Sequence, residues 1–260
     1  MQRVAIVGMA RTPIGKFGGQ LASKSAVELG TIAIEAALSR ARVAKEQVDE
    51  VYMGMAVQAG QGQNPARQAA RNAGLADATP AVTINVLCGS GMEAVSMAAK
   101  QIRLGDAEVM VAGGMESMSN APYLLPKARG GYRFGDGQLV DGLVKDGLTD
   151  AFYGYPMGIT AENLLEQAPI ERERIDAFAL RSHQKARAAQ QAGRFADEIV
   201  PVTVTTKQGP VEVTADEGVR DTSMAALAKL KPAFKADGQV PAGNAASLDD
   251  GGAALVLMAE

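Results

Sequence analysis

The chain has 260 residues, of which 47% are hydrophobic and 21% are charged, and its formal net charge is −3. This size suits one elaborated domain with a sizeable core, and the near-neutral charge excludes a general attraction to nucleic acid or to anionic membranes. One cysteine and one histidine are present, so an intramolecular disulfide is excluded and no metal site is expected.

Apolar runs in this sequence are too short to span a bilayer, and the first residues lack the apolar core of a signal peptide. We therefore expect a cytoplasmic protein that binds neither membranes nor nucleic acid.

Strand-like and helical patterns alternate over residues 1–119. Apolar runs predict four strands, at 4–10, 48–57, 81–87 and 109–115. Apolar residues at helical spacing predict helices over 25–42, 65–73 and 89–104, with Ser23 or Ser25 and Asn64 as N-caps. This alternation is typical of a mostly parallel sheet covered by helices.

The regular pattern loosens over residues 120–248, which include a Gly/Tyr/Pro-rich stretch, a long helical pattern at 172–192 and β-like residues at 199–206. We interpret this region as an insertion that covers a ligand. The apolar run at 253–258 then predicts a fifth strand, so that residues 249–260 return to the core. The predicted fold is a three-layer α/β unit with a five-stranded mixed sheet and a large α+β loop insertion.

Cys88 lies where an apolar strand pattern, ending in Val86-Leu87, meets Gly89-Ser90-Gly91 and a helical pattern. At such a turn the free N–H groups and the helix dipole stabilise a thiolate, which makes the sulfur a usable nucleophile. The alternative is that Cys88 is a small buried hydrophobe, the usual fate of a lone cysteine. Spacing alone supports the two interpretations equally.

Four segments resemble thiolase signatures and occur in the thiolase order. They are Arg11-Thr12-Pro13-Ile14-Gly15-Lys16-Phe17-Gly18-Gly19, Asn85 to Gly91, Gly113-Gly114-Met115-Glu116-Ser117-Met118-Ser119 and Met157-Gly158-Ile159-Thr160-Ala161-Glu162-Asn163. The segments Gly60 to Gln68 and Asp249-Asp250-Gly251 fit as well. The chain therefore resembles the N-terminal domain of the thiolases with its loop insertion, and the biosynthetic acetoacetyl-CoA thiolases most of all.

This resemblance implies that Cys88 accepts an acyl group from acyl-CoA and passes it to the carbanion of a second thioester, or in reverse cleaves a 3-ketoacyl-CoA. Acetyl-CoA or acyl-CoA would then be substrates, with no cofactor. The resemblance places CoA and acyl contacts at Leu148, Met157, Arg220, Ser223, Ala246 and Ser247. Thiolases usually have a serine where Ala246 stands, so that contact is in doubt and Ser247 is the alternative.

The activating histidine of thiolases lies in a Gly-His-Pro segment, and their second cysteine precedes a Gly-rich loop, both in a C-terminal domain. Neither motif occurs in these 260 residues, and the lone His183 lies in a polar helical pattern that predicts a surface role. We therefore expect turnover only with a C-terminal thiolase domain or subunit, and an assembly of two or four thiolase units.

Three alternatives remain open at this point. The chain is either a natural subunit or a truncated piece of a longer protein. It could instead be a non-catalytic thiolase-like subunit that binds acyl-CoA or serves only in assembly. A ketoacyl synthase is a further alternative, which the Met157-Gly158 and Arg220 segments disfavour. The acyl chain length and the direction of the reaction are also open.

Overall fold

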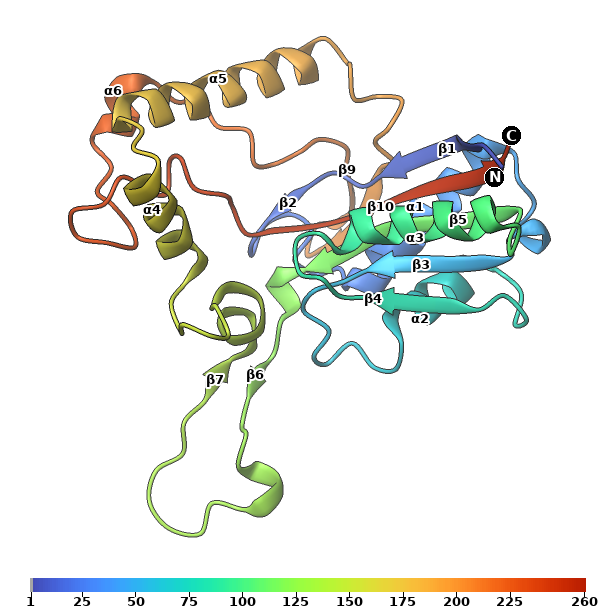
Figure 1. Ribbon diagram of the computed structural model, residues 1–260, viewed down its shortest axis with the longest axis horizontal. Helices are drawn as coiled ribbons and strands as arrows, with labels where there is room; N and C mark the ends of the chain where they lie inside the picture. The colour runs from blue at the N-terminus through green and yellow to red at the C-terminus, as the bar shows by residue number, and fades with distance from the viewer. Residues whose placement is uncertain (1) are drawn as a thin grey trace.

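A mixed β-sheet runs through the centre of the structure, a computed structural model in which residues 2–260 are described (Figure 1). Its long strands lie in the order β1 (Val4–Arg11), β10 (Asp249–Ala259), β5 (Val109–Ser117), β3 (Glu50–Gly54) and β4 (Ala81–Ile84). β10 pairs antiparallel with β1 and β5, whereas β3 pairs in parallel with β5 and β4. The five predicted strands and the mixed sheet are confirmed, and a two-residue strand, β2 (Gly15–Lys16), also pairs with β10.

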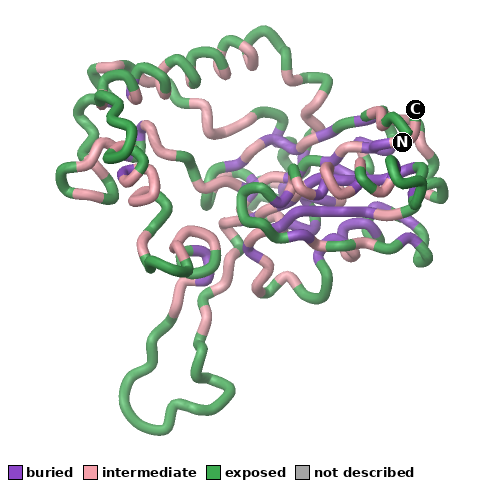
Figure 2. The backbone as a smooth tube through the Cα atoms, in the orientation of Figure 1, coloured by how far each residue is buried: buried purple, intermediate pink, exposed green. Residues whose placement is uncertain are grey.

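Helices cover both faces of the sheet, as the three-layer prediction requires. They are α1 (Ala26–Ala41) and α2 (Pro65–Asn72) on one face and α3 (Ser90–Leu104) on the other. The alternation of side chains along β3 shows the two faces, because Val51 and Met53 pack with residues of α1 and α2, while Tyr52 packs with residues of α3. The buried residues gather along the sheet (Figure 2).

Two of the helices begin at side-chain caps that the sequence predicts. Ser25 is the N-cap of α1, since its hydroxyl accepts the Glu28 N–H at 3.2 Å and the Glu28 carboxylate accepts the Ser25 N–H at 2.9 Å. Asn64 caps α2 by accepting the Arg67 N–H at 3.2 Å. Of the two candidates for α1, Ser25 is therefore correct.

The chain between β5 and β10 forms small elements of its own. They are η2 (Met118–Asn120), β6 (Tyr123–Leu124), η3 (Ala128–Gly130), β7 (Val140–Asp141), η4 (Leu143–Leu148), α4 (Met157–Gln167), α5 (Arg172–Gln191), β8 (Val202–Thr206), β9 (Gly209–Val213) and α6 (Met224–Ala228). A further short helix, η1 (Lys45–Gln47), precedes β3. The predicted helix over 172–192 is confirmed as α5, and the β-like piece is confirmed as β8, which begins at Val202 rather than at 199.

These elements lie in three places relative to the sheet (Figure 1). The connection between β6 and β7 projects from the body as an arm and is exposed along its length (Figure 2). The β8–β9 hairpin packs on the core, where Val202, Val204 and Val213 join Leu21 and Leu29. Helices α4, α5 and α6 lie beyond the carboxyl end of β5. The division of the chain at residues 119 and 248 stays a prediction.

No helix in the described part of the chain, residues 2–260, is long and apolar enough to cross a membrane.

Candidate active site

Cys88 lies in the turn between β4 and α3, and its side chain is exposed. The strand predicted over 81–87 is too long by three residues, because the chain leaves the sheet at Asn85. The N–H of Val86 donates to Ser90 Oγ at 3.0 Å, and the N–H of Leu87 donates to Asn85 Oδ1 at 3.0 Å, so side chains replace a neighbouring strand as acceptors. The interpretation of Cys88 as a buried hydrophobe is wrong.

The residue before Cys88 adopts an uncommon backbone conformation. Leu87 has φ of 54°, in the left-handed region that non-glycine residues rarely occupy. Ser90 secures this turn, since its N–H and its hydroxyl both donate to the Leu87 carbonyl, at 3.0 and 2.5 Å. Cys88 is thereby held next to Gly89, the N-cap of α3.

Glycines beneath the turn let the start of α3 rest on the backbone of the sheet. A Cβ added at Gly54 would lie 2.5 Å from Gly91 N and closer still to the carbonyl carbon of Ser90. A Cβ at Gly114 would lie 3.3 Å from Gly91 Cα. The depth of the turn therefore depends on glycine at these positions.

A cavity of about 550 Å³ opens beside Cys88. Its walls are residues 54–57 at the end of β3, residues 87, 88, 90 and 91 of the turn, residues 114–116 of β5, Gly147, and residues 249–253 of β10. Arg11, Ile14 and Met118 also line it. The volume falls within the range of small-molecule sites. Because many of these residues are glycine or alanine, a substrate could approach the backbone closely.

Three carboxylates line this cavity, those of Glu116, Asp249 and Asp250, and none of them is among the site residues predicted from the sequence. Glu116 accepts the N–H of Ala56 at 2.8 Å and that of Val57 at 3.2 Å. Burial raises the pKa of Glu116, against the lowering effect of these two bonds, and Asp250 adds to the rise. Asp250 is fully buried, and its carboxylate accepts from the Ser119 N–H and hydroxyl at 3.0 and 2.5 Å.

A family model, the thiolase N-terminal domain, matches residues 4–260. This chain belongs to the thiolase family. It is 55% identical over 257 residues to an acetyl-CoA acetyltransferase of Chromobacterium violaceum and 54% identical over 260 residues to one of Cupriavidus necator. These alignments cover 98% and 99% of this chain and 66% of each relative.

A solved structure, the acetyl-CoA acetyltransferase of Bacillus anthracis, superposes on this thiolase chain with a TM-score of 0.97 at 45% identity. The match covers 100% of this chain and 66% of that protein. The chain thus spans just under two thirds of the length of these relatives.

The residues at which the thiolase resemblance places CoA contacts lie outside the walls of the Cys88 cavity, although Gly147 and Asp249 beside them line it. Leu148 ends η4 and is half-buried, and Met157 is the first residue of α4 and is exposed. Ala246 and Ser247 are exposed in the loop before β10, where the Ser247 hydroxyl donates to Asp249 Oδ2 at 2.8 Å.

Arg220 and Ser223 lie on the loop that leads into α6. Arg220 is exposed, and its guanidinium donates weakly to the Ala242 carbonyl at 3.4 Å, so it is accessible to an anion. Ser223 is the N-cap of α6, and its hydroxyl accepts the Ala226 N–H at 3.2 Å. The structure brings Arg220 close to His183 rather than to Cys88.

His183 is half-buried, which corrects the prediction of a solvated surface position. Its Nδ1 accepts the backbone N–H of Arg220 at 3.2 Å, because the loop that carries Arg220 packs on α5. Burial lowers the pKa of His183, and the charges of Arg220 and Arg187 lower it further. His183 is absent from the walls of the Cys88 cavity.

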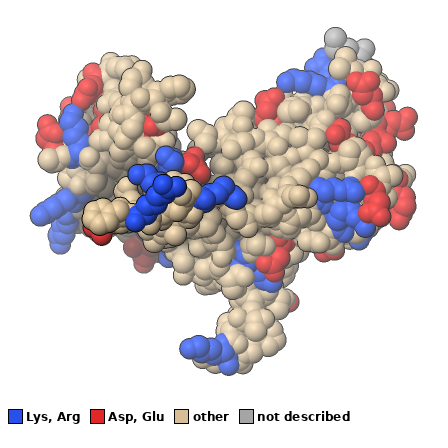
Figure 3. Space-filling model, turned by 90° about the horizontal axis from the view of Figure 1, so that it is seen from below, with Lys and Arg blue, Asp and Glu red and all other residues tan. Residues whose placement is uncertain are grey.

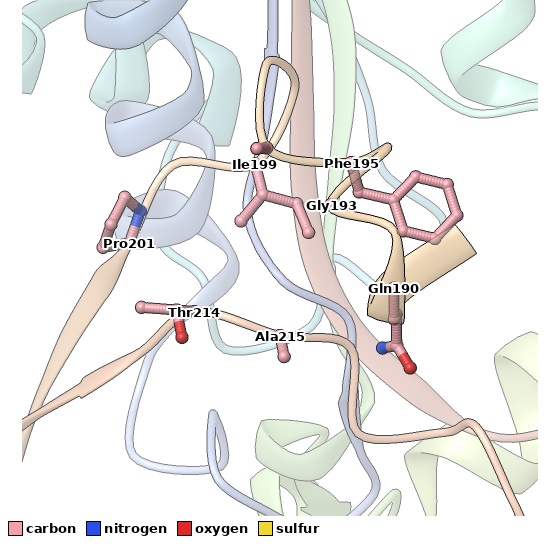
Figure 4. Close-up of a pocket in the computed structure, with 8 residues that line it drawn as sticks. Gln190, Gly193, Phe195, Ile199, Pro201, Thr214 and Ala215 are labelled. Atoms are coloured by element: carbon pink, nitrogen blue, oxygen red, sulfur yellow. The ribbon is translucent and has the colours of Figure 1, made fainter. Parts of the chain in front are cut away.

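A second cavity, of about 360 Å³, lies between the end of α5, the loop at 193–201 and the end of β9 (Figure 4). Phe195, Ile199 and Pro201 give it apolar walls, and Gln190 and Thr214 are polar groups on its lining. None of its lining residues is charged, and none of them lines the Cys88 cavity.

Among residues 2–260, no group of three or more His, Cys, Asp or Glu side chains is arranged to hold a metal ion. On the face seen from below, small groups of acidic and basic side chains, several of them side by side, lie around a broad uncharged surface (Figure 3).

Proposed function

We propose that this chain carries the acyl-accepting half of a thiolase reaction. The Cys88 thiolate attacks the carbonyl of an acyl-CoA, the bond to the CoA sulfur breaks, CoA leaves as the thiolate, and an acyl-Cys88 thioester remains. A second acetyl-CoA, as its α-carbanion, then takes the acyl group and frees Cys88. The observation that carries this proposal is an exposed cysteine beside the start of a helix, opening onto a cavity, in a chain of the thiolase family.

The turn also suggests how the developing oxyanion is stabilised. The N–H groups of Gly89 and Ser90 are bonded to the carbonyls of Val86 and Leu87, at 3.3 and 3.0 Å. We assign the backbone N–H of Cys88 itself to the oxyanion of the substrate carbonyl. A donor held in place by the fold before the reaction costs no reorganisation when charge develops.

The CoA portion is assigned to the elements between β5 and β10. Arg220 would bind a phosphate, because a guanidinium matches phosphate geometry with two parallel donors. Ser223 would border the nucleotide, and Leu148, Met157, Ala246 and Ser247 would line the path to Cys88. These loops lie beyond the carboxyl end of β5 (Figure 1), and residues 114–116 near that end line the Cys88 cavity.

The second half of the reaction needs a base that removes an α-proton from acetyl-CoA, and the sequence holds only one histidine, which does not line the cavity. We therefore assign that base and a second cysteine to a C-terminal thiolase domain, on the same polypeptide or on a partner.

An assembly of two or four units fits two exposed valines, Val82 in the edge strand β4 and Val86 just after it, at 39% and 54% exposure. The oligomer and the cytoplasmic location both stay predictions.

Intact-protein mass spectrometry after incubation with acetyl-CoA tests the proposal, with a C-terminal thiolase domain present. One acetyl adduct is expected on the wild-type chain and none on Cys88→Ala. An adduct that persists in Cys88→Ala would show that another residue carries the acyl group. CoA binding without any adduct would favour the non-catalytic alternative.

A further inference from the structure

Glu116 lines the Cys88 cavity but has no part in the acyl transfer described above. It lies near the end of β5 and is half-buried, and its two carboxylate oxygens accept consecutive backbone N–H groups, those of Ala56 and Val57 at 2.8 and 3.2 Å. Residues 55–57, which follow β3, are thereby fastened to the end of β5.

A second set of hydrogen bonds leads from this segment to the catalytic turn. The carbonyl of Ala56, whose N–H is bonded to Glu116, accepts Asn85 Nδ2 at 3.1 Å. The other side-chain atom of that amide, Asn85 Oδ1, accepts the Leu87 N–H at 3.0 Å. Leu87 has the left-handed φ of 54° and directly precedes Cys88. The bonds therefore form one continuous path from Glu116 to the residue next to the nucleophile.

We propose that Glu116 is a positioning residue for Cys88. It acts through Ala56 and Asn85 to hold Leu87 in its strained conformation, and so sets the Cys88 sulfur at the start of α3. The inference rests on the proposed function in one respect, that Cys88 is the nucleophile.

A carboxylate suits this role because two neighbouring N–H groups need two acceptor oxygens. The ionised group supplies both, and hydrogen bonds to it are stronger than bonds between neutral groups. Glutamine has nearly the same shape, but its amide nitrogen is a donor and would face one of the two N–H groups. Glu116→Gln should therefore loosen residues 55–57 while keeping the packing of the side chain.

The test is the rate at which iodoacetamide alkylates Cys88, measured between about pH 6 and about pH 9, the range in which thiols titrate. The variants are Glu116→Gln, Asn85→Ala and the double variant. Each single change should slow alkylation about three- to tenfold, the effect of one neutral hydrogen bond. Because both residues lie on one path, the double variant should be no slower than the slower single variant. An unchanged rate in Glu116→Gln, or effects that multiply in the double variant, would overturn the proposal.

Glu162→Gln is the matched control for general loosening. Glu162 is a buried carboxylate on α4 that also accepts consecutive N–H groups, those of Gln239 and Val240 at 2.9 and 2.8 Å, but it is not on the path to Cys88. Its replacement should lower the melting temperature and leave alkylation unchanged. An equal slowing of alkylation in Glu162→Gln would show that loss of stability alone causes the effect.

Alkylation requires neither CoA nor a second domain. A failure of this inference is therefore distinguishable from a failure of acetylation by acetyl-CoA.

Discussion

The backbone N–H of Arg220 donates a hydrogen bond to Nδ1 of His183, with 3.2 Å between the two nitrogens. This bond joins α5 to the loop that carries the proposed phosphate contact, and it requires Nδ1 to be unprotonated. The protonation state of His183 is thereby linked to the position of the loop that carries Arg220.

Stability should depend on pH through His183. Burial, followed by Arg220 and Arg187, lowers its pKa from the ordinary 6.5. At low pH the folded protein therefore binds fewer protons at His183 than the unfolded chain does. The contribution of His183 to the free energy of unfolding is fully present above about pH 6.5, and it is lost as the pH falls through the lowered pKa of the folded state.

The comparison that isolates this effect is His183→Asn, whose amide oxygen can accept the same N–H without titrating. Between about pH 7.5 and about pH 5, the melting temperature of the wild type should fall more than that of His183→Asn. Parallel curves for the two proteins would contradict the assignment.

Arg220→Ala should weaken CoA binding about tenfold, because hydrogen bonds to charged groups contribute more than neutral ones. Titration calorimetry with CoA measures the change. Arg194→Ala, which removes another exposed arginine from the loop after α5, is the control and should bind CoA as the wild type does. Equal affinities for wild type and Arg220→Ala would remove Arg220 from the site.

Gly54→Ala should destabilise the protein and disturb the Cys88 turn together. The new Cβ would lie 2.5 Å from Gly91 N and closer still to the carbonyl carbon of Ser90, and these backbone atoms cannot easily move away. We expect the free energy of unfolding to fall by about 2 kcal/mol or more, as for other overpacked sites. Denaturant unfolding measures it, and Gly218→Ala, whose Cβ would meet no atom within 4 Å, should be nearly neutral.

The 260-residue chain by itself should show no thiolysis of acetoacetyl-CoA. In the proposed reaction Cys88 accepts the acyl group, but the described residues that line its cavity include no histidine for the remaining proton transfers. Activity should appear when a C-terminal thiolase domain is added. Robust turnover by the chain alone, abolished by His183→Ala, would instead make His183 the base.

Local patterns in the sequence predicted much of the scaffold. The five strands, the caps at Ser25 and Asn64, and the turn that presents Cys88 all depend on residues within a few positions of one another. The strand predicted over 81–87 is wrong only in its last three residues. There the N–H groups of Val86 and Leu87 donate to the side chains of Ser90 and Asn85, whereas the prediction had them donating to a neighbouring strand.

The α/β class, the resemblance to thiolases in four motifs and the candidate nucleophile Cys88 follow from the sequence alone, because periodicity, capping and motifs depend on neighbouring residues. The place of β10 between β1 and β5, the hold of Glu116 on residues 56 and 57 and the contact of His183 with Arg220 become visible only in the folded structure. Each of these features joins residues far apart in the chain, and the hydrogen bonds and burial that produce them exist only once the layers have packed.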